Sequence, residues 1–345
     1  MAPTVTVLAP MLRKAGSRRR RCTCNDRGTI RGVRVTISCL ATCAISAALA
    51  TQAPPISAIS RGEEATLVRL LDDATGRRRS SDSWLHWEPH FLKGARGRTY
   101  VPFTVRLDDA GESFRNVAVG VRVIGITLRS GWNDEFGIET TASGDGRVFR
   151  ASFLVNPGLY RIIVAVLDRD TPRRGVHSAV VEQRVEIPDL AKKGLHISSV
   201  VLADRIDDLP QTISDRDRAA YPYAFGAKIV VPARPGPFRR DDRLTVMFQI
   251  YNPAMFEDGK PDVEVHYEVL RDGMEDKPVG STAAQLFNQE SLPEEFSLKE
   301  GFQLVPIQVL PLSQFEPGAY KLRVEVQDVL GNARVRADVP FTVQP

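Results

Sequence analysis

Two histidines and a glutamate at alternate positions form the densest group of metal-binding residue types in the chain. His86, Glu88 and His90 lie within the stretch HWEPH. Imidazole nitrogens and a carboxylate oxygen are ligands that Zn²⁺ accepts. Pro89 interrupts the stretch, so the three side chains cannot share one face of a helix. We therefore expect an ordinary loop here rather than a metal site.

Two aspartate-containing turns raise the question of calcium binding. DRDTPRRG contains Asp168 and Asp170, and FEDGKPD contains Asp258 and Asp262. Calcium takes six or more oxygen ligands in a set geometry, and neither turn has the spacing of an EF-hand loop. Aspartate and glycine favour turns between strands without any metal. We predict plain turns, with a calcium cage as the alternative.

Aromatic residues beside acids form another candidate site in SGWNDEFG. Adjacent carboxylates such as Asp134 and Glu135 could be glycosidase acids, but neighbouring side chains usually point apart. Trp132 and Phe136 could stack on a sugar ring or contact a protein. The alternative, which we favour, is a tryptophan folded back over the end of a domain.

A second aromatic stretch, AAYPYAFG, lies between expected strands. Its residues Tyr221 and Tyr223 are interpreted as an inter-domain hinge or a docking surface. The candidate contact residues of the chain are therefore Trp132, Phe136, Tyr221 and Tyr223.

The motifs of common enzyme classes are missing from the sequence. It has no Gly-x-Ser-x-Gly elbow, phosphate loop, dinucleotide fingerprint or His-Glu-x-x-His. All four cysteines lie in the first 50 residues, so the remainder has no disulfide, thiolate ligand or cysteine nucleophile. We predict that the chain is not an enzyme and has no catalytic, cofactor-binding or metal-binding residue. An active site assembled from distant loops is the alternative.

The sequence predicts one amphipathic helix, which precedes all of the candidate site residues discussed above. Ser60 and Glu63 have the spacing of a capping box. Gly76 ends the pattern. The positions that fall on one helical face are Leu67, Leu70, Leu71 and Ala74.

From about Tyr100 onward, apolar and polar residues alternate, which predicts antiparallel strands with one buried face. Similar strands recur in the same order in both halves of the chain. The clearest repeat is NPGLYRIIVAVLD at 156–168 and EPGAYKLRVEVQD at 316–328. Two series of short strands predict two similar β-sandwiches.

The two copies of this strand differ on the face away from the expected core. The second copy alternates Lys321, Arg323 and Glu325 outward, whereas the first presents Ile163, Ala165 and Leu167 in the corresponding region. Three apolar side chains in a row rarely face water on one strand. We predict that the helix around Leu67, Leu70 and Leu71 covers them.

The Pro-Gly-x-Tyr turns resemble the turn before strand F of immunoglobulin-like and fibronectin type III-like sandwiches. The resemblance implies a tyrosine corner, in which Tyr160 and Tyr320 would bond to the backbone near the turn. The predicted fold is thus all-β, with two tandem immunoglobulin-like β-sandwiches preceded by one short amphipathic helix. The inter-sheet disulfide of antibody domains cannot form without cysteines.

GRTYVPFTVRLD, PGLYRIIVAVLDRDT and HISSVVLAD resemble the carboxyl-terminal sandwich regions of secreted bacterial proteins related to von Willebrand factor A. The resemblance spans residues 97–345. The von Willebrand domain itself and its Asp-x-Ser-x-Ser metal motif are absent, so its adhesion chemistry does not carry over.

The amino terminus is typical of an export signal. VRVTISCLATCAISAALA follows basic residues and ends in Ala48-Leu49-Ala50, which predicts cleavage after Ala50 and a secreted or periplasmic protein without a transmembrane span. An uncleaved anchor is the alternative. The Arg-rich residues before Val33 suggest that translation starts near Val33 rather than at Met1.

Charge separates this leader from the rest of the chain. Residues 1–50 hold nine of the 46 basic and one of the 42 acidic residues, so the remainder has 37 bases, 41 acids and a formal charge of −4. A nucleic-acid surface needs concentrated Lys and Arg, and we predict none.

The expected organisation is a leader (1–50), a helix and linker (51–96), a first sandwich (97–190) and a second sandwich (191–345). Sandwiches display variable loops on rigid sheets, which favours an exported binding or scaffold protein with a protein partner in the envelope or secreted fraction. The alternative is a carbohydrate-binding or accessory module of a polysaccharide-handling system.

Overall fold

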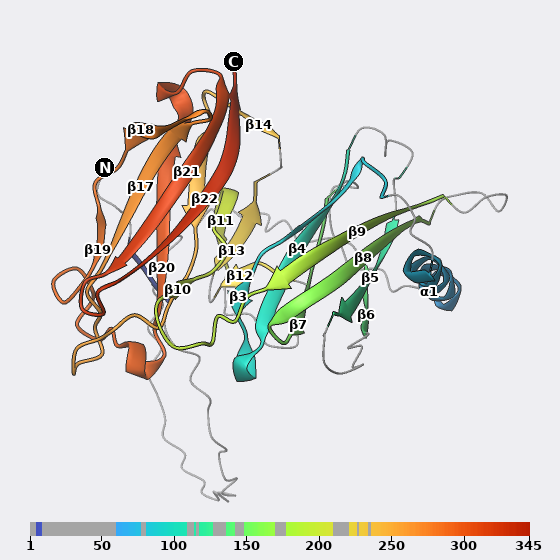
Figure 1. Cartoon of the computed structure of the whole chain (residues 1–345), viewed down its shortest axis with the longest axis horizontal. Coiled ribbons are helices and arrows are strands. Elements are labelled where there is room, and N and C mark those ends of the chain that lie inside the picture. Colours follow the sequence, from blue (N-terminus) through green and yellow to red (C-terminus); the bar gives the residue numbers. More distant parts are fainter. Residues whose placement is uncertain are drawn as a thin grey trace, which may run out of the picture. The chain divides into compact units, whose positions relative to one another are not determined.

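Over the residues that it describes, the computed structural model shows an all-β protein with one α-helix, which confirms the predicted all-β class (Figure 1). The described residues are 5–8, 60–76, 81–108, 114, 117–126, 136–141, 148–169, 177–209, 221–225, 228–233 and 236–345. The expected signal and its cleavage point after Ala50 lie outside them. No helix in these ranges has the length and apolar character needed to cross a membrane.

Helix α1 (Arg61–Gly76) begins at the predicted capping box. The Glu63 amide donates to Ser60 Oγ (3.3 Å), and the Ser60 amide donates to Glu63 Oε2 (2.7 Å). Two amides that have no partner within the helix thereby gain acceptors. The buried side chains are those expected from the apolar spacing, namely Leu67, Leu70, Leu71 and Ala74.

Two four-stranded sheets enclose the core of the first half. In one sheet, β2 and β3 pair with one side of β4, and β7 pairs with the other side. The other sheet has the order β6-β5-β8-β9. The strands are β2 (Leu85–Pro89), β3 (Leu92–Lys93), β4 (Thr99–Leu107), β5 (Val117–Gly125), β6 (Phe136–Thr141), β7 (Val148–Val155), β8 (Gly158–Asp168) and β9 (Ser178–Ile187), with a 3₁₀ turn at Ala95–Gly97. Phe103, Val121 and Ile162 meet in one core, so the two sheets form a β-sandwich.

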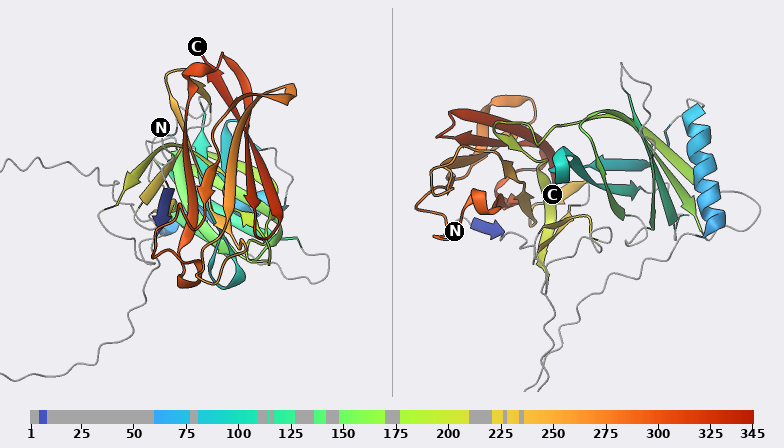
Figure 2. Two further views of the ribbon diagram at one scale, coloured as in Figure 1. Left: turned by 90° about the vertical axis from the view of Figure 1, so that its left-hand side faces the viewer. Right: turned by 90° about the horizontal axis from the view of Figure 1, so that it is seen from below.

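Helix α1 packs on the outer face of this second sheet, beside β5 and β8 (Figures 1 and 2). Its apolar side chains form one buried cluster with Ile163, Ala165 and Leu167 of β8, which confirms the predicted cover. Gly120 of β5 permits the close approach. A Cβ at that position would lie 3.3 Å from Leu71 Cδ1 and 3.4 Å from Leu67 Cβ.

Ion pairs and hydrogen bonds hold the carboxyl end of α1 on the sheet. Arg161 of β8 donates to the main-chain oxygens of Ala74 (3.1 Å) and Thr75 (3.3 Å) and pairs with Glu182 (2.6 Å). A positive side chain at this end of a helix satisfies free carbonyls and complements the helix dipole. The helix is therefore fixed by polar contacts as well as by its apolar face.

Two further sheets enclose the core of the second half. The larger has the order β10-β16-β20-β15-β11-β13-β12, and the other has β14-β22-β21-β17-β18, with β19 also paired to β17. A short strand, β1 (Val5–Leu8), pairs with Gln303–Pro306 of β20. The other strands are β10 (His196–Ile197), β11 (Val201–Asp208), β12 (Ala224–Phe225), β13 (Lys228–Pro232), β14 (Pro237–Arg239), β15 (Arg243–Met247), β16 (Ile250–Tyr251), β17 (Val263–Arg271), β18 (Met274–Ser281), β19 (Gln285–Phe287), β20 (Gln303–Pro311), β21 (Gly318–Asp328) and β22 (Ala333–Gln344), with 3₁₀ turns at Leu298–Glu300 and Leu312–Gln314.

The second core also draws on both sheets. Leu244 and Val246 from the larger sheet meet Tyr267 and Val324 from the smaller one. The second half is thus a second β-sandwich. Its smaller sheet keeps an open outer face, whose side chains alternate with those of the core along β17, β21 and β22.

The repeated Pro-Gly-x-Tyr turns have the same geometry in both sandwiches. Tyr160 donates its hydroxyl hydrogen to the main-chain oxygen of Asn156 (2.8 Å), and Tyr320 donates to that of Glu316 (2.6 Å). In each case the acceptor lies four residues upstream, and the ring is buried in the core. This is the hydrogen bond expected of a tyrosine corner.

Candidate functional site

The three residues of the HWEPH cluster lie on and just after strand β2, each with different neighbours. His86 Nε2 lies 2.7 Å from Asp108 Oδ2, and His90 Nδ1 shares a hydrogen bond with the Tyr223 hydroxyl (2.9 Å). The stretch is a strand rather than the expected loop, because its apolar positions Leu85 and Trp87 point into the first core. Over the described ranges, no group of three or more metal-binding side chains comes together.

The aspartates of the two turns make structural contacts. Asp258 accepts hydrogen bonds from the Lys260 amide (2.9 Å) and from Gln289 Nε2 (3.1 Å). Asp168 is buried at the end of β8, with its Oδ2 3.8 Å from His177 Nδ1. Asp170 lies outside the described residues.

The aromatic candidates fall in different environments. Trp132, Asp134 and Glu135 lie outside the described residues, and Phe136 begins strand β6, whose side chains are not described. Tyr221 is half-buried. Tyr223 is only 2% exposed, so it is not an open contact surface.

Tyr223 instead joins the two sandwiches. Its hydroxyl bonds His90 of the first half and lies 3.3 Å from Thr104 Oγ1, while its ring packs in a buried cluster with Leu92 and Val201. Burial raises the pKa of Tyr223 and lowers the pKa of His90 to about 4. Both groups are therefore neutral at pH 7, as a buried junction requires.

A hollow of about 370 Å³ opens beside the loop between β16 and β17. Met255 and Phe302 contribute apolar atoms to it, and Gln249, Tyr251 and Gln303 contribute polar groups. A second hollow of about 410 Å³ lies near Glu88 and His90 and has mainly apolar walls. Burial raises the pKa of the Glu88 carboxyl there, although part of the residue remains exposed.

Exposed apolar side chains gather at one end of the second sandwich. Met255 and Phe256 lie in the β16–β17 loop and are 43% and 36% exposed. Val329 and Leu330, in the turn between β21 and β22, are 42% and 40% exposed. We call these four residues the loop-end surface.

Asp328 connects the two segments of the loop-end surface. Its carboxylate is buried and accepts hydrogen bonds from the amides of Ala254 (2.7 Å) and Gly331 (2.8 Å). The Val329 amide donates to the main-chain oxygen of Asp262 (2.9 Å). A buried carboxylate without such donors would be costly, so these bonds hold both segments in one arrangement.

The β16–β17 loop is also fixed within itself and to its neighbour. The Phe256 amide donates to the Lys260 oxygen (2.8 Å), and the Leu298 amide donates to the Gly259 oxygen (2.9 Å). Gly259 has φ +83°, and a Cβ there would lie 2.0 Å from Ser297 Oγ, so glycine is required. The loop therefore displays Met255 and Phe256 on a preorganised backbone.

Sequence reasoning did not identify the loop-end surface. From the sequence, FEDGKPD was interpreted only as a turn or calcium loop, and no role was predicted for Val329 and Leu330. One signal was present, because Met255 and Phe256 are apolar residues between the turn formers Asn252-Pro253 and Asp258-Gly259.

No protein-family model matches the chain, and no curated protein sequence matches it. The residues and contacts described above are therefore the basis for a functional proposal.

Proposed function

We propose that this chain is an exported, non-enzymatic binding or scaffold protein that docks another protein through the loop-end surface. The observation that carries the proposal is the gathering of Met255, Phe256, Val329 and Leu330 in water on two hydrogen-bonded segments. Grouped exposed apolar side chains are typical of interaction sites.

Preorganisation supports a binding role for these loops. A loop that is already fixed loses little conformational entropy when a partner covers it. The adjoining hollow, with Met255 and Phe302 in its wall, would accept an apolar side chain of that partner. Buried aromatic and apolar anchors in such pockets carry most of the free energy of many interfaces.

Export is the second part of the proposal and rests on the leader sequence alone. The predicted outcome is a mature protein that begins at Thr51 and is found outside the cytoplasm. Amino-terminal sequencing of the protein recovered from cell fractions tests this directly, and a cytoplasmic protein with an intact leader would refute it.

Site-specific photo-cross-linking tests the docking surface in the producing cells. A photoreactive phenylalanine analogue replaces Phe256 in one variant and Met274 in a matched control. Met274 is 64% exposed and follows the other end of β17, about 30 Å away at about 3.3 Å per strand residue. We expect a protein that cross-links from position 256 and not from position 274.

Binding measurements with the identified protein, once purified, test whether it docks at the loop-end surface. Met255→Ser and Phe256→Ser should each weaken its Kd about tenfold, which is the effect of losing about 1.4 kcal/mol of contact. Met274→Ser should leave the Kd unchanged. Equal binding by all three variants, or identical cross-links from both positions, would refute protein docking at this surface. A cross-linked polysaccharide would instead support the carbohydrate-binding alternative.

A further inference from the structure

Six exposed carboxylates lie in and beside the β16–β17 loop that carries Met255 and Phe256. Glu257 and Asp258 directly follow Phe256 in the β16–β17 loop. The others lie in the segment between β19 and β20. We call the six the acidic rim, and its members are Glu257, Asp258, Glu290, Glu294, Glu295 and Glu300.

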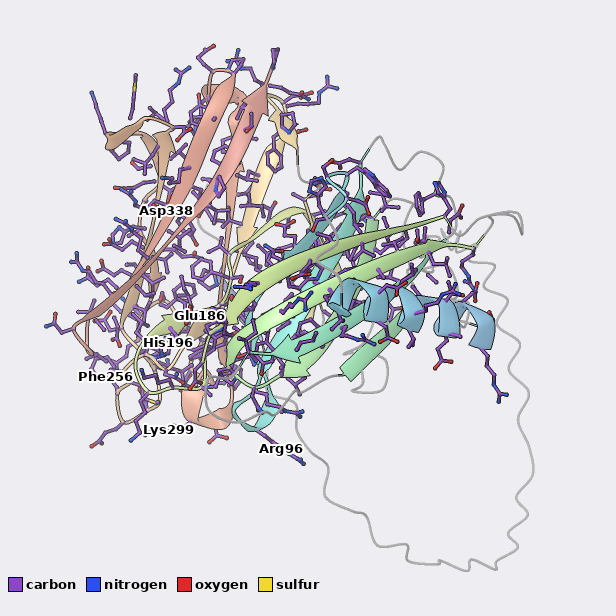
Figure 3. All side chains as sticks on the ribbon, turned by 45° about the vertical axis from the view of Figure 1, so that its right-hand side comes forward. Arg96, Glu186, His196, Phe256, Lys299 and Asp338 are labelled. Carbon is purple, nitrogen blue, oxygen red and sulfur yellow. The ribbon has the colours of Figure 1, made fainter. Side chains whose placement is uncertain are left out.

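Hydrogen bonds place the two segments of the acidic rim side by side. Gln289 Nε2 donates to Asp258 Oδ2 (3.1 Å), and Lys299 Nζ donates to the Glu257 main-chain oxygen (2.6 Å). Figure 3 shows Phe256 and Lys299 at the same end of the second sandwich, with Asp338 farther along β22. The rim and the apolar residues therefore belong to one surface.

Few positive charges lie within the two segments that carry the acidic rim. Over the described residues, no carboxylate of the rim forms an ion pair within 4.0 Å. Lys260 is buried, where its ammonium group lies 3.5 Å from the Leu292 oxygen, and Lys299 is the exposed cation of these two segments. Backbone amides of the loop keep the pKa of Asp258 below its usual value, so that carboxylate stays charged.

The outer face of the smaller sheet differs from the acidic rim, because its charges are paired. There Arg323 pairs with Asp338 (3.2 Å) and Arg334 pairs with Glu325 (3.6 Å), across adjacent strands. Charges of both signs alternate on that face and compensate one another. The acidic rim has no such pairing among the described residues, and it lies next to Met255 and Phe256.

We infer that the partner docked at the loop-end surface presents a basic amphipathic segment, whose apolar side chains cover Met255 and Phe256 and whose Lys or Arg residues face the acidic rim. This inference rests on the proposed function and specifies the chemistry of the partner. Complementary charge around an apolar contact speeds association and selects against acidic partners.

Two synthetic peptides of 15 residues test the inference on the full-length protein. Both have leucine at the same helical positions, and the remaining positions are lysine in one and glutamate in the other. Fluorescence anisotropy of the labelled peptides gives the Kd at low and high salt. At about 50 mM NaCl, we expect the lysine peptide to bind at least tenfold more tightly than the glutamate peptide. Its affinity should fall at least threefold by about 300 mM NaCl, because salt screens exposed charges.

Variants with equal changes of charge show whether the acidic rim itself is responsible. The rim variant combines Glu257→Gln, Glu290→Gln and Glu295→Gln. The control removes three exposed acids elsewhere and combines Glu186→Gln, Asp208→Asn and Asp241→Asn. We expect the rim variant to lose at least fivefold in affinity for the lysine peptide, and the control to stay within twofold of the unchanged protein.

The outcomes separate this inference from the function on which it rests. Equal affinity for both peptides, or equal losses in the rim variant and the control, would overturn the basic partner. Docking itself would still stand if Phe256→Ser weakened binding of the purified cross-linked protein. Phe256→Ser should also lower the affinity for the lysine peptide at least threefold. Unchanged affinity would mean that charge attraction alone binds the peptide, and it would overturn the inference.

Discussion

The amino-terminal turn of helix α1 offers a direct test of how the helix is held on the first sandwich. Glu63 closes the capping box with Ser60 and also pairs with Arg169 at the end of β8, at 2.6 Å. The hydrogen bond from Arg169 is the largest cause that lowers the pKa of Glu63 to about 2, against partial burial, and the bonds from Ser60 add to it. Replacing Glu63 by Gln keeps the shape of the side chain and removes this charge.

The expected loss is about 0.5–2 kcal/mol of unfolding free energy at pH 7. A fall of the pKa from 4.5 to about 2 corresponds to about 3 kcal/mol as an upper bound. The Glu63 side chain is 20% exposed, so solvent screens the pair. Exposed ion pairs contribute about 0.2–1 kcal/mol, and a negative charge in the first turn of a helix contributes about 0.3–1 kcal/mol, which together give our expectation.

The sign of the pH dependence follows from the lowered pKa. A carboxyl with a lower pKa in the folded state stabilises the fold fully above its unfolded pKa of about 4.5. That contribution disappears as the pH falls from about 4.5 to about 2. The variant should therefore be less stable than the unchanged protein at pH 7 and equally stable near pH 2.

Urea unfolding followed by tryptophan fluorescence measures this difference, since Trp87 is buried in the first core and Trp84 packs against it. Glu64→Gln is the matched control, because it removes the neighbouring charge in the same helical turn and leaves Glu63 and Arg169 in place. A difference that persists unchanged at pH 2, or equal losses in the two variants at pH 7, would refute the role assigned to Glu63.

Two other predictions concern the tyrosine corner and the junction. Tyr320→Phe removes the bond to the Glu316 oxygen and should lower the unfolding free energy by about 1 kcal/mol in urea titrations, and an unchanged midpoint would contradict this. Because His90 is buried with a pKa of about 4, the unfolded state takes up its proton first as the pH falls. Stability should thus fall by up to about 3 kcal/mol from pH 6.5 to pH 4, and His90→Gln should reduce that slope. An identical slope in the variant would show that other groups cause it.

Local patterns in the sequence were enough to predict the helix and what it covers. Ser60 and Glu63 lie three residues apart, and their capping bonds depend only on that spacing. Ile163 and Leu167 lie four residues apart on one strand, so their side chains point to the same face of the sheet. An apolar face of this kind needs a cover, which could be inferred from the sequence alone. The sequence did not reveal Gly120 as a point of close approach between helix and sheet, because that role depends on where β5 lies in the sheet.

The junction and the loop-end surface depend on residues far apart in the chain. His90 and Tyr223 are separated by 133 positions, and neither residue type indicates its partner. Asp328 fixes Ala254 from 74 positions away. In the sequence, Asp328 is only the last residue of a strand. It is buried because the β16–β17 loop and the β21–β22 turn both pack against it. Long-range contacts of this kind cannot be deduced from hydrophobic periodicity.

The two copies of the repeated strand show why docking is assigned to loops in the second sandwich. In β8, Ile163 and Leu167 make the outer face apolar, and α1 occupies it. In β21 the same face has Arg323, which pairs with Asp338 across the strands and stays partly in water. A partner that covered this paired face would have to remove both charges from water, at a cost that exceeds what the ion pair returns. At Phe256 the exposed group is apolar and its backbone is already bonded, so covering it releases water without breaking any such pair.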